Sequence, residues 1–409
     1  MTENINFITY PEMLEQLETT NLENHLLLGN GFNLSLGIKT GYKDIFQQMK
    51  INNSDYKSVM GENFDLENFI GECKKQISSQ NNPHYEFMTK FYHNKIKLDF
   101  MNAVTQIVSK EIKNIYQEKN EKIYLLLKNF NNFFTLNYDP FLYQFLMSFK
   151  KEPEKAIAFS TEFPFIKDLV QEEDKKLFDL IHEAYLSGEL SVSIPNHPKK
   201  TSDLKNMKKS DFSREIQNYL KDSYPKKQIQ RVVNKIWDEI NKKNGKYIEN
   251  LDDGFGLFGK ELVYIHPETQ NLFFLHGAFH IYKKGKSIYK ITQQSEKSLY
   301  HRIEEIVENS EENILCIFSD TNKMQEINQE EYFLNGINRL GEIKGNIVII
   351  GCSFSDNDNH IFNQIKNSEI ETIYVAAFKT EMEKIYLIKK LFSNKKIFFF
   401  DIETITYSK

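Results

Sequence analysis

Short apolar runs without polar alternation recur along the chain. They are rich in branched and aromatic side chains, and uninterrupted runs of this length are typical of strands buried on both faces. We therefore expect strands of a parallel sheet at residues 25–28, 133–136, 272–275, 314–318, 347–350, 373–377 and 397–400.

Segments with helical periodicity lie between most of these runs, at residues 65–75, 102–116, 322–340 and 381–392. Strands that alternate with helices predict an α/β fold in which helices flank the parallel sheet. About 100 residues separate the first strand from the second, and about 135 separate the second from the third. Both gaps exceed the length of a crossover helix, so we expect large helical insertions.

The second gap contains a lysine-rich stretch at residues 196–243. It is either a solvated helical flap or a basic lid or partner-binding surface. We expect residues 1–150 to form the first part of the sheet domain with a helical insertion, residues 151–260 a lysine-rich insertion or lid, and residues 261–409 the second part. An amphipathic helix is predicted within the stretch, because these apolar residues fall on one helical face: Ile229, Val232, Val233, Ile236, Trp237 and Ile240.

Composition narrows the class of protein. The 409 residues carry a formal net charge of −5, which excludes the pervasive basic surface of a protein that coats nucleic acid, although a local basic patch stays open. Cys73, Cys316 and Cys352 are too few and too far apart for a disulfide framework or a four-cysteine zinc site, so we expect a reducing compartment. The sequence shows neither a targeting leader nor an apolar window of about 18 residues, and a soluble, cytoplasmic protein is expected.

The first strand runs into a turn flanked by Gly29 and Gly31. Such a turn lets backbone amides approach a diphosphate. Leu34 stands where the third glycine of G-x-G-x-x-G belongs, and no acidic residue follows a second strand at the expected distance. A tight strand-to-helix turn without a ligand is the alternative interpretation.

Polar residues also follow the next two strands. Asn137 comes too early to cap the following helix, and its neutral amide can hold a ribose hydroxyl or a water, whereas for Asp139 we favour a capping role before Pro140. His276, followed by a glycine, suits a general base near neutral pH. His276 and His280 have the spacing of a metal pair on a helix, but no H-E-x-x-H pattern accompanies them, so we expect no metal.

A further strand ends in Gly351, Cys352 and Ser353, where Gly351 and Ser353 are suited to receive the ribose or phosphate of a nucleotide. For Asp356 and Asp358 we favour capping of a helix that starts near residue 360. These turns all follow strands of the predicted sheet at its carboxyl edge, where open α/β folds bind ligands. The sequence lacks a P-loop and a nucleophile elbow, and no motif marks Cys352 as a nucleophile.

The chain resembles the sirtuin-like superfamily, and within it bacterial phage-defence proteins, including the AbiH-like abortive-infection group and the related domain family of unknown function DUF4917. An ordered set of motifs that spans nearly the whole chain carries the resemblance. The motifs lie at residues 29–33, 37–44, 64–67, 135–139, 275–280 and 351–358.

The resemblance implies a Rossmann-like domain that binds NAD and, in the defence members, hydrolyses its nicotinamide–ribose bond. The family's catalytic asparagine and histidine fall on Asn137 and His276. The implied nucleotide-binding positions are Gly29, Asn30, Gly31, Phe32, Asn33, Thr40, Asp139, Gly351 and Ser353.

Two departures from the sirtuin pattern matter. Three scattered cysteines cannot supply the four-cysteine zinc module of protein deacylases, so deacylation is disfavoured. The G-I-P-D-F-R stretch is missing, and residues 37–44 stand loosely in its place.

The expected function is therefore that of an NAD+ hydrolase, an antiphage abortive-infection effector that depletes NAD. We expect NAD+ as substrate, a phage-derived or operon-encoded trigger, a homo-oligomer, and neither a membrane nor a nucleic acid as partner. The alternative is a sensor or assembly module that binds NAD or ADP-ribose without cleaving it. A third option makes the lysine-rich insertion a nucleic-acid contact.

Overall fold

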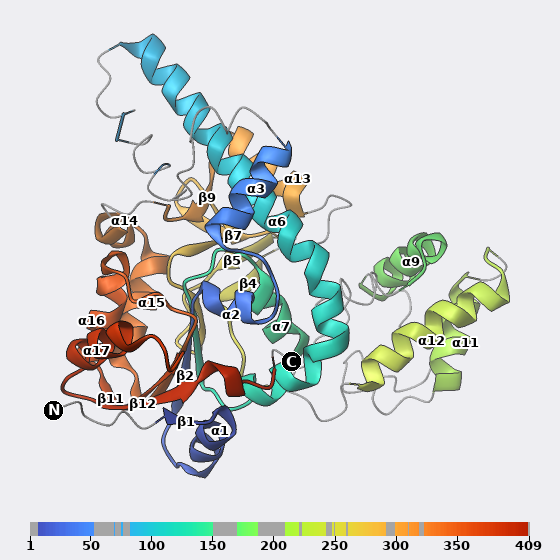
Figure 1. Ribbon diagram of the computed structural model, residues 1–409. Coiled ribbons are helices and arrows are strands. Elements are labelled where there is room, and N and C mark those ends of the chain that lie inside the picture. Colours follow the sequence, from blue (N-terminus) through green and yellow to red (C-terminus); the bar gives the residue numbers. More distant parts are fainter. Residues whose placement is uncertain are drawn as a thin grey trace. The chain divides into compact units, whose positions relative to one another are not determined.

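The computed structural model describes residues 7–52, 69, 75–76, 82–149, 170–186, 209–220, 223–242, 248, 250–258, 261–291, 299–309, 311–318 and 323–407 (Figure 1). The chain divides into two units, Met1–Pro140 with Asp252–Lys409, and Phe141–Leu251.

The larger unit is built on seven parallel strands in the order β1-β12-β11-β10-β2-β3-β6. This sheet confirms the predicted α/β, Rossmann-like fold, and each predicted strand except residues 314–318 lies in it. β1 was not predicted, because two residues are too short for a pattern. The strands are β1 Phe7–Ile8, β2 Asn24–Leu28, β3 Asn132–Thr135, β6 Leu272–Phe274, β10 Lys344–Ile350, β11 Glu369–Ala377 and β12 Lys396–Asp401.

Helices flank this sheet, and Figure 1 shows α6 on the opposite side from α15, α16 and α17. Residues 102–116 lie inside the 45-residue α6, while the predicted helix at 322–340 is divided at Glu330 into α14 and α15. The predicted helix 65–75 and the motif at 64–67 fall outside the described residues, apart from positions 69 and 75. The helices are α1 Tyr10–Thr19, α2 Asn30–Ser35, α3 Tyr42–Asn52, α6 Pro83–Leu127, α13 Leu299–Glu308, α14 Lys323–Gln329, α15 Glu331–Glu342, α16 Asn359–Asn367 and α17 Met382–Leu391.

A second, antiparallel sheet has the order β4-β5-β8-β7-β9. It corrects the prediction for residues 314–318, because β9 pairs antiparallel with β7. The apolar run of β9 does not show whether the strand belongs to the parallel or to the antiparallel sheet. The change of sheet occurs at Gly277, whose φ of 82° only glycine adopts readily, and a Cβ there would lie 1.9 Å from the Leu315 carbonyl oxygen. The strands are β4 Phe255–Phe258, β5 Glu261–Tyr264, β7 Gly277–Lys284, β8 Ser287–Lys290 and β9 Glu312–Cys316.

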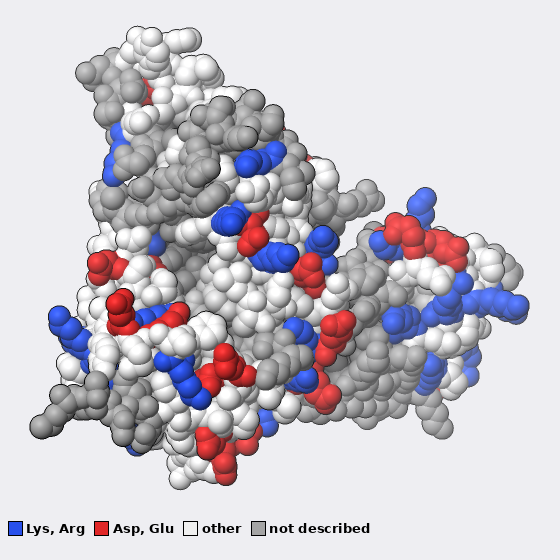
Figure 2. Space-filling view, viewed as in Figure 1, with Lys and Arg blue, Asp and Glu red and all other residues white. Residues whose placement is uncertain are grey.

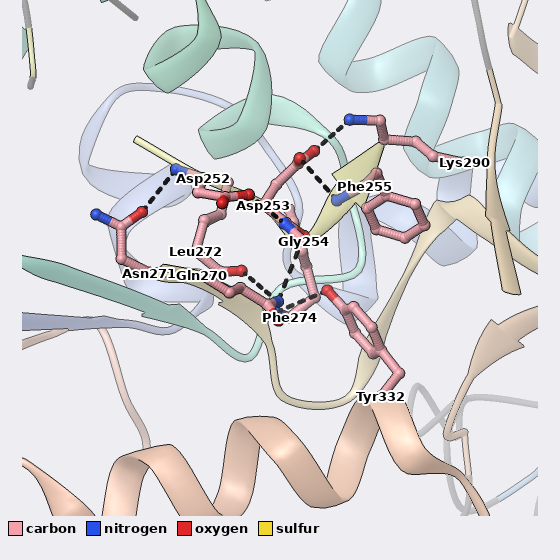
Figure 3. A network of polar contacts seen from close by, with 10 residues as sticks. All are labelled: Asp252, Asp253, Gly254, Phe255, Gln270, Asn271, Leu272, Phe274, Lys290 and Tyr332. Carbon is pink, nitrogen blue, oxygen red and sulfur yellow. Dashed lines mark hydrogen bonds and ion pairs between the residues drawn. The ribbon is translucent and has the colours of Figure 1, made fainter. Parts of the chain in front are cut away.

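A buried polar network joins the start of this second sheet to β6 (Figure 3). The Lys290 ammonium pairs with the Asp253 carboxylate and lies 5.1 Å from the centroid of the Phe255 ring. The side-chain amide of Gln270 donates to the Leu272 carbonyl oxygen at 3.1 Å. Buried charges are tolerated only when they are paired in this way.

The described secondary structure of the unit Phe141–Leu251 is mainly helical, with α7 Phe141–Phe149, η1 Glu172–Asp174, α9 Lys175–Leu186, α11 Lys209–Leu220 and α12 Lys226–Lys242. The predicted amphipathic helix is α12, and its residues Ile229, Val232, Val233 and Ile236 are buried in the core of the unit. These four side chains are therefore not available to a partner.

Acidic and basic side chains stand next to one another on this helical unit (Figure 2). Arg231 of α12 binds Asp174 through two hydrogen bonds of 2.6 and 2.8 Å and Glu173 through one of 2.6 Å. Part of the basic charge predicted for a lid or a nucleic-acid contact is thus neutralised within the unit. Among the described residues, none of the helices combines the length and the hydropathy needed to cross a membrane.

Candidate functional site

The turns that follow β2 and β10 interlock through their backbones. The Gly31 amide donates to the Gly351 carbonyl oxygen at 2.9 Å. A Cβ on Gly29 would lie 2.6 Å from the Gly351 oxygen, and one on Gly31 would lie 2.6 Å from the Gly351 Cα. Gly351 itself has a φ of 77°. Close packing of two backbones therefore explains the three glycines without a ligand.

This packing also engages amides that the glycine turn was predicted to offer to a diphosphate. The Phe32 amide donates to the Gly29 carbonyl oxygen at 3.0 Å, and the Gly29 amide donates to the Ile350 carbonyl oxygen at 2.9 Å. With the Gly31 amide also engaged, a nucleotide at this turn has to be held mainly by side chains. The nucleotide-binding role of Gly29, Gly31 and Phe32 stays a prediction.

Replacing Gly31 with alanine is expected to lower the free energy of unfolding by about 1–3 kcal/mol, because the new Cβ meets backbone that cannot move aside alone. Urea unfolding measures the change. Gly41→Ala is the matched control, since its Cβ would meet only the flexible Asp44 carboxylate, at 3.3 Å. An equal free energy of unfolding for the two variants would contradict the conclusion that the backbones of the two turns are closely packed.

Asn30 and Thr40 form a reciprocal pair. The Thr40 hydroxyl donates to Asn30 Oδ1 at 2.6 Å, and Asn30 Nδ2 donates to the Thr40 carbonyl oxygen at 2.7 Å. Thr40 is buried whereas Asn30 is exposed. The pair holds the start of α2 against the loop at 37–41, so Thr40 supports the turn.

Three buried polar side chains connect α2 to the end of β3. Asn33 Nδ2 donates to the Asp139 carboxylate at 2.8 Å, and Asn137 Nδ2 faces Asn33 Oδ1 at 3.4 Å. Asp139 thus has a partner from another strand connection, in addition to its position shortly before α7. The arrangement fixes the Asn137 amide next to the glycine turn.

His276 lies after β6 in a second polar group. Its Nε2 is 3.2 Å from His360 Nε2 and 3.8 Å from the Asp358 carboxylate. The Lys323 ammonium binds the same Asp358 oxygen at 3.1 Å. Asp358 occupies the N-cap position of α16, but its side chain makes no capping hydrogen bond, which corrects the capping role predicted for it. The Asp358 carboxylate accepts from Lys323 instead.

The electrostatic environment keeps both imidazoles neutral. Burial, followed by the charge of Lys323 and by His360, lowers the pKa of His276 well below its ordinary value of 6.5. Burial also lowers the pKa of His360, to about 4. At neutral pH His276 therefore has an unprotonated nitrogen that can accept a proton.

The remaining predicted residues are dispersed. Ser353 is exposed and its hydroxyl donates to the Ser355 hydroxyl at 3.3 Å, whereas burial raises the pKa of the Cys352 thiol, which makes it a poor nucleophile. Residues 277–284 form a strand, so His276 and His280 are not a helical metal pair. Within the described ranges, no group of three or more His, Cys, Asp or Glu side chains is arranged to hold a metal ion.

Buried neutral histidines make the fold sensitive to acid. Burial lowers the pKa of His280 to about 3 and that of His360 to about 4, so between pH 6.5 and about 4 the unfolded chain binds more protons than the folded one. Stability is expected to fall as the pH drops through this window, by up to about 1.4 kcal/mol per pH unit for each histidine.

Urea unfolding at pH 7 and pH 5 measures this loss. His360→Gln is expected to show a smaller loss between the two pH values than the wild type, while His84→Gln, at an exposed residue, keeps the wild-type loss. The same loss in all three proteins would contradict the account.

The order β10-β2-β3-β6 places the four turns side by side at the carboxyl edge of the sheet, as predicted. Gly351 contacts the glycine turn, and Asn137 contacts Asn33. His276 belongs to the second group, and the ring centroid of Tyr138, the residue after Asn137, lies 6.4 Å from that of His276. Sequence reasoning gave no role to His360 or Lys323. His360 could have been found from the sequence, because it belongs to the polar stretch after β10. No pattern in the sequence marks Lys323.

A cavity of about 370 Å³ lies elsewhere, beside β9 and α14. Its lining includes Lys283, Cys316, Glu326 and Phe333 but none of the predicted site residues. The candidate site is thus defined by the strand ends rather than by this cavity.

Fold and site define a Rossmann-like α/β protein with buried amide and imidazole groups at the carboxyl edge of its sheet. Residues 236–407 match the family model described as a domain of unknown function, DUF4917, which confirms that part of the predicted resemblance. The match contains His276, Lys323, Asp358 and His360, whereas Asn137 and the glycine turn precede it. No curated protein matches the chain.

Proposed function

We propose that this protein is a sirtuin-like NAD+ glycohydrolase that cleaves the nicotinamide–ribose bond. The observation that carries the proposal is the position of Asn137 and His276 after the neighbouring strands β3 and β6, with the imidazole held neutral. An amide and an unprotonated imidazole nitrogen at this edge match the needs of a reaction that builds positive charge on a ribose.

In the proposed reaction, the bond between the anomeric carbon and nicotinamide breaks, and nicotinamide leaves with the bonding electron pair. Water forms the new bond to the anomeric carbon and loses a proton. His276 accepts that proton, and Asn137 holds the water or a ribose hydroxyl through its amide. ADP-ribose and nicotinamide are the products.

Side chains at the turns hold the nucleotide in this proposal. Asn30 and Ser353 are exposed at the ends of β2 and β10 and supply amide and hydroxyl groups for a ribose or a phosphate. The backbone amides of Gly31 and Phe32 are already engaged within the protein. The Asn30 amide uses one hydrogen and one oxygen lone pair for Thr40 and keeps a second of each, whereas a backbone amide has only one hydrogen. Nucleotide binding is therefore assigned to Asn30 and to the Ser353 hydroxyl oxygen, which can still accept, rather than to the glycine amides.

The burial of the reactive groups suits an enzyme that is restrained at rest. His276 is 2% exposed and Asn137 is 9% exposed. A cytoplasmic enzyme that depletes NAD has to be inactive until it is needed. On the resemblance to phage-defence proteins, we assign the protein to antiphage abortive infection, with a phage-derived or operon-encoded trigger. No metal is required for this reaction.

The same burial also favours a second candidate function, that of a module which binds NAD or ADP-ribose and cleaves nothing. Chromatography of NAD incubated with the protein separates the two. Release of nicotinamide together with ADP-ribose supports the hydrolase, whereas saturable NAD binding without release, in the protein isolated from phage-infected cells as well, would support the binding module.

A further inference from the structure

The contact between His276 and His360 restricts where their protons lie. The two Nε2 atoms are 3.2 Å apart, and the ring centroids are 5.3 Å apart. In a hydrogen bond between neutral imidazoles, one Nε2 carries the proton and the other accepts it. The direction of this bond decides which nitrogen of His276 has a lone pair available for chemistry.

Two neighbouring acceptors set the direction. The Asp358 carboxylate lies 3.8 Å from Nε2 of His276, and an anion favours a proton on the nitrogen that faces it. The backbone carbonyl of Asn357 acts in the same sense from the other side of the pair, because it raises the pKa of His360 as an acceptor at that ring does. Because Nε2 of His360 faces His276, the nitrogen that serves Asn357 is Nδ1. His360 is then protonated at Nδ1 and its Nε2 accepts, so His276 donates from Nε2.

The charged groups around the pair support a neutral resting state that can receive one proton. Lys323 is 6% exposed and its charge disfavours protonation of both rings. The Asp358 carboxylate, 3.8 Å from His276 Nε2, stabilises a positive charge on the ring once it forms. Asp358 and Lys323 bind each other, so neither is left as an isolated buried charge.

We propose that His360 is a positioning residue that holds His276 in its Nε2–H tautomer and thereby makes Nδ1 of His276 the base nitrogen, a role that rests on the hydrolase function proposed above. When Nδ1 takes the proton of the attacking water, the ring becomes an imidazolium. Its Nε2–H bond to His360 is kept throughout, and the proton leaves again from Nδ1 after the product departs.

The tautomer is tested directly by long-range ¹H–¹⁵N NMR of protein labelled with ¹⁵N-histidine. The signals of the pair are identified by their disappearance in His276→Gln and His360→Gln. Lone-pair nitrogens at Nδ1 of His276 and Nε2 of His360 support the proposal, whereas a protonated Nδ1 on His276 would overturn it. This readout does not depend on NAD cleavage.

Two variants of His360 test its effect on the reaction. Phenylalanine keeps a ring of similar shape without an acceptor, whereas glutamine places a carbonyl oxygen near the position of Nε2. His360→Phe is expected to lose roughly 10-fold or more in kcat with little change in KM, which is less than the 10²- to 10⁴-fold that a general base contributes. His360→Gln is expected to stay within about 3-fold of the wild type, because it restores the acceptor.

Equal losses in the two variants, or none in His360→Phe, would overturn the positioning role. Thermal unfolding of each variant confirms that the compared proteins are folded. If the wild type shows the expected tautomers but releases no nicotinamide, the hydrolase proposal fails while the assignment of the pair holds. If the wild type releases nicotinamide with the opposite tautomers, only the present inference fails.

Discussion

Replacement of His276 by glutamine is expected to lower the rate of nicotinamide release by about 10²- to 10⁴-fold, the usual contribution of a general base. Glutamine keeps a polar group of similar reach but has no nitrogen that accepts a proton. Asn137→Ala is expected to reduce the rate as well, because the water or ribose hydroxyl loses its amide partner. Initial rates of nicotinamide release, measured by chromatography, provide the test.

His280→Gln is the matched control for His276→Gln. His280 is also buried, but it lies on β7, and the pKa of its ring is lowered by burial to about 3. We expect this variant to keep the wild-type rate when it is folded. Full activity in His276→Gln, or equal losses in the two histidine variants, would contradict the assignment of the base.

Replacement of Lys290 by methionine is expected to lower the free energy of unfolding by about 3–5 kcal/mol, because it leaves the Asp253 carboxylate buried without its counter-charge. The side chains of Lys290 and Asp253 are 5% and 7% exposed, so water does not readily replace the lost partner. The loss of the ammonium beside the Phe255 ring adds to the effect. Urea unfolding of the full chain measures the change.

The double variant Asp253→Asn with Lys290→Met is the control for this prediction. It removes both charges and is expected to recover a large part of the lost stability, because no isolated charge remains in the core. A single variant as stable as the wild type would show that the pair does not support the second sheet.

The sheet was predictable because its strands are buried on both faces. The residues of β2 are all buried, and those of β10 are buried from Gly345 onward, so the apolar runs Leu26–Leu28 and Ile347–Ile350 mark both strands. The same signal failed for β9, since an apolar run does not show whether its partner strand is parallel. The other strands of the antiparallel sheet, β4, β5, β7 and β8, were not predicted, because no uninterrupted apolar run marks them in the sequence.

The site was predictable in position but only partly in its contacts. Residues that follow neighbouring strands share an edge, so Asn137, His276 and Gly351 could be placed together from topology alone. The bond between His276 and His360 depends on side-chain directions after β6 and in the first turn of α16, which spacing does not encode. The three glycines at the turns mark a tight backbone contact, and sequence alone does not distinguish that contact from a diphosphate site.

NAD concentration in cells, measured with and without phage challenge, tests the central claim most directly. Cells that express the wild-type chain are expected to lose NAD and to accumulate nicotinamide and ADP-ribose after challenge, whereas cells that express His276→Gln at the same level keep their NAD. Unchanged NAD in both, or equal depletion in both, would contradict a hydrolase whose base is His276.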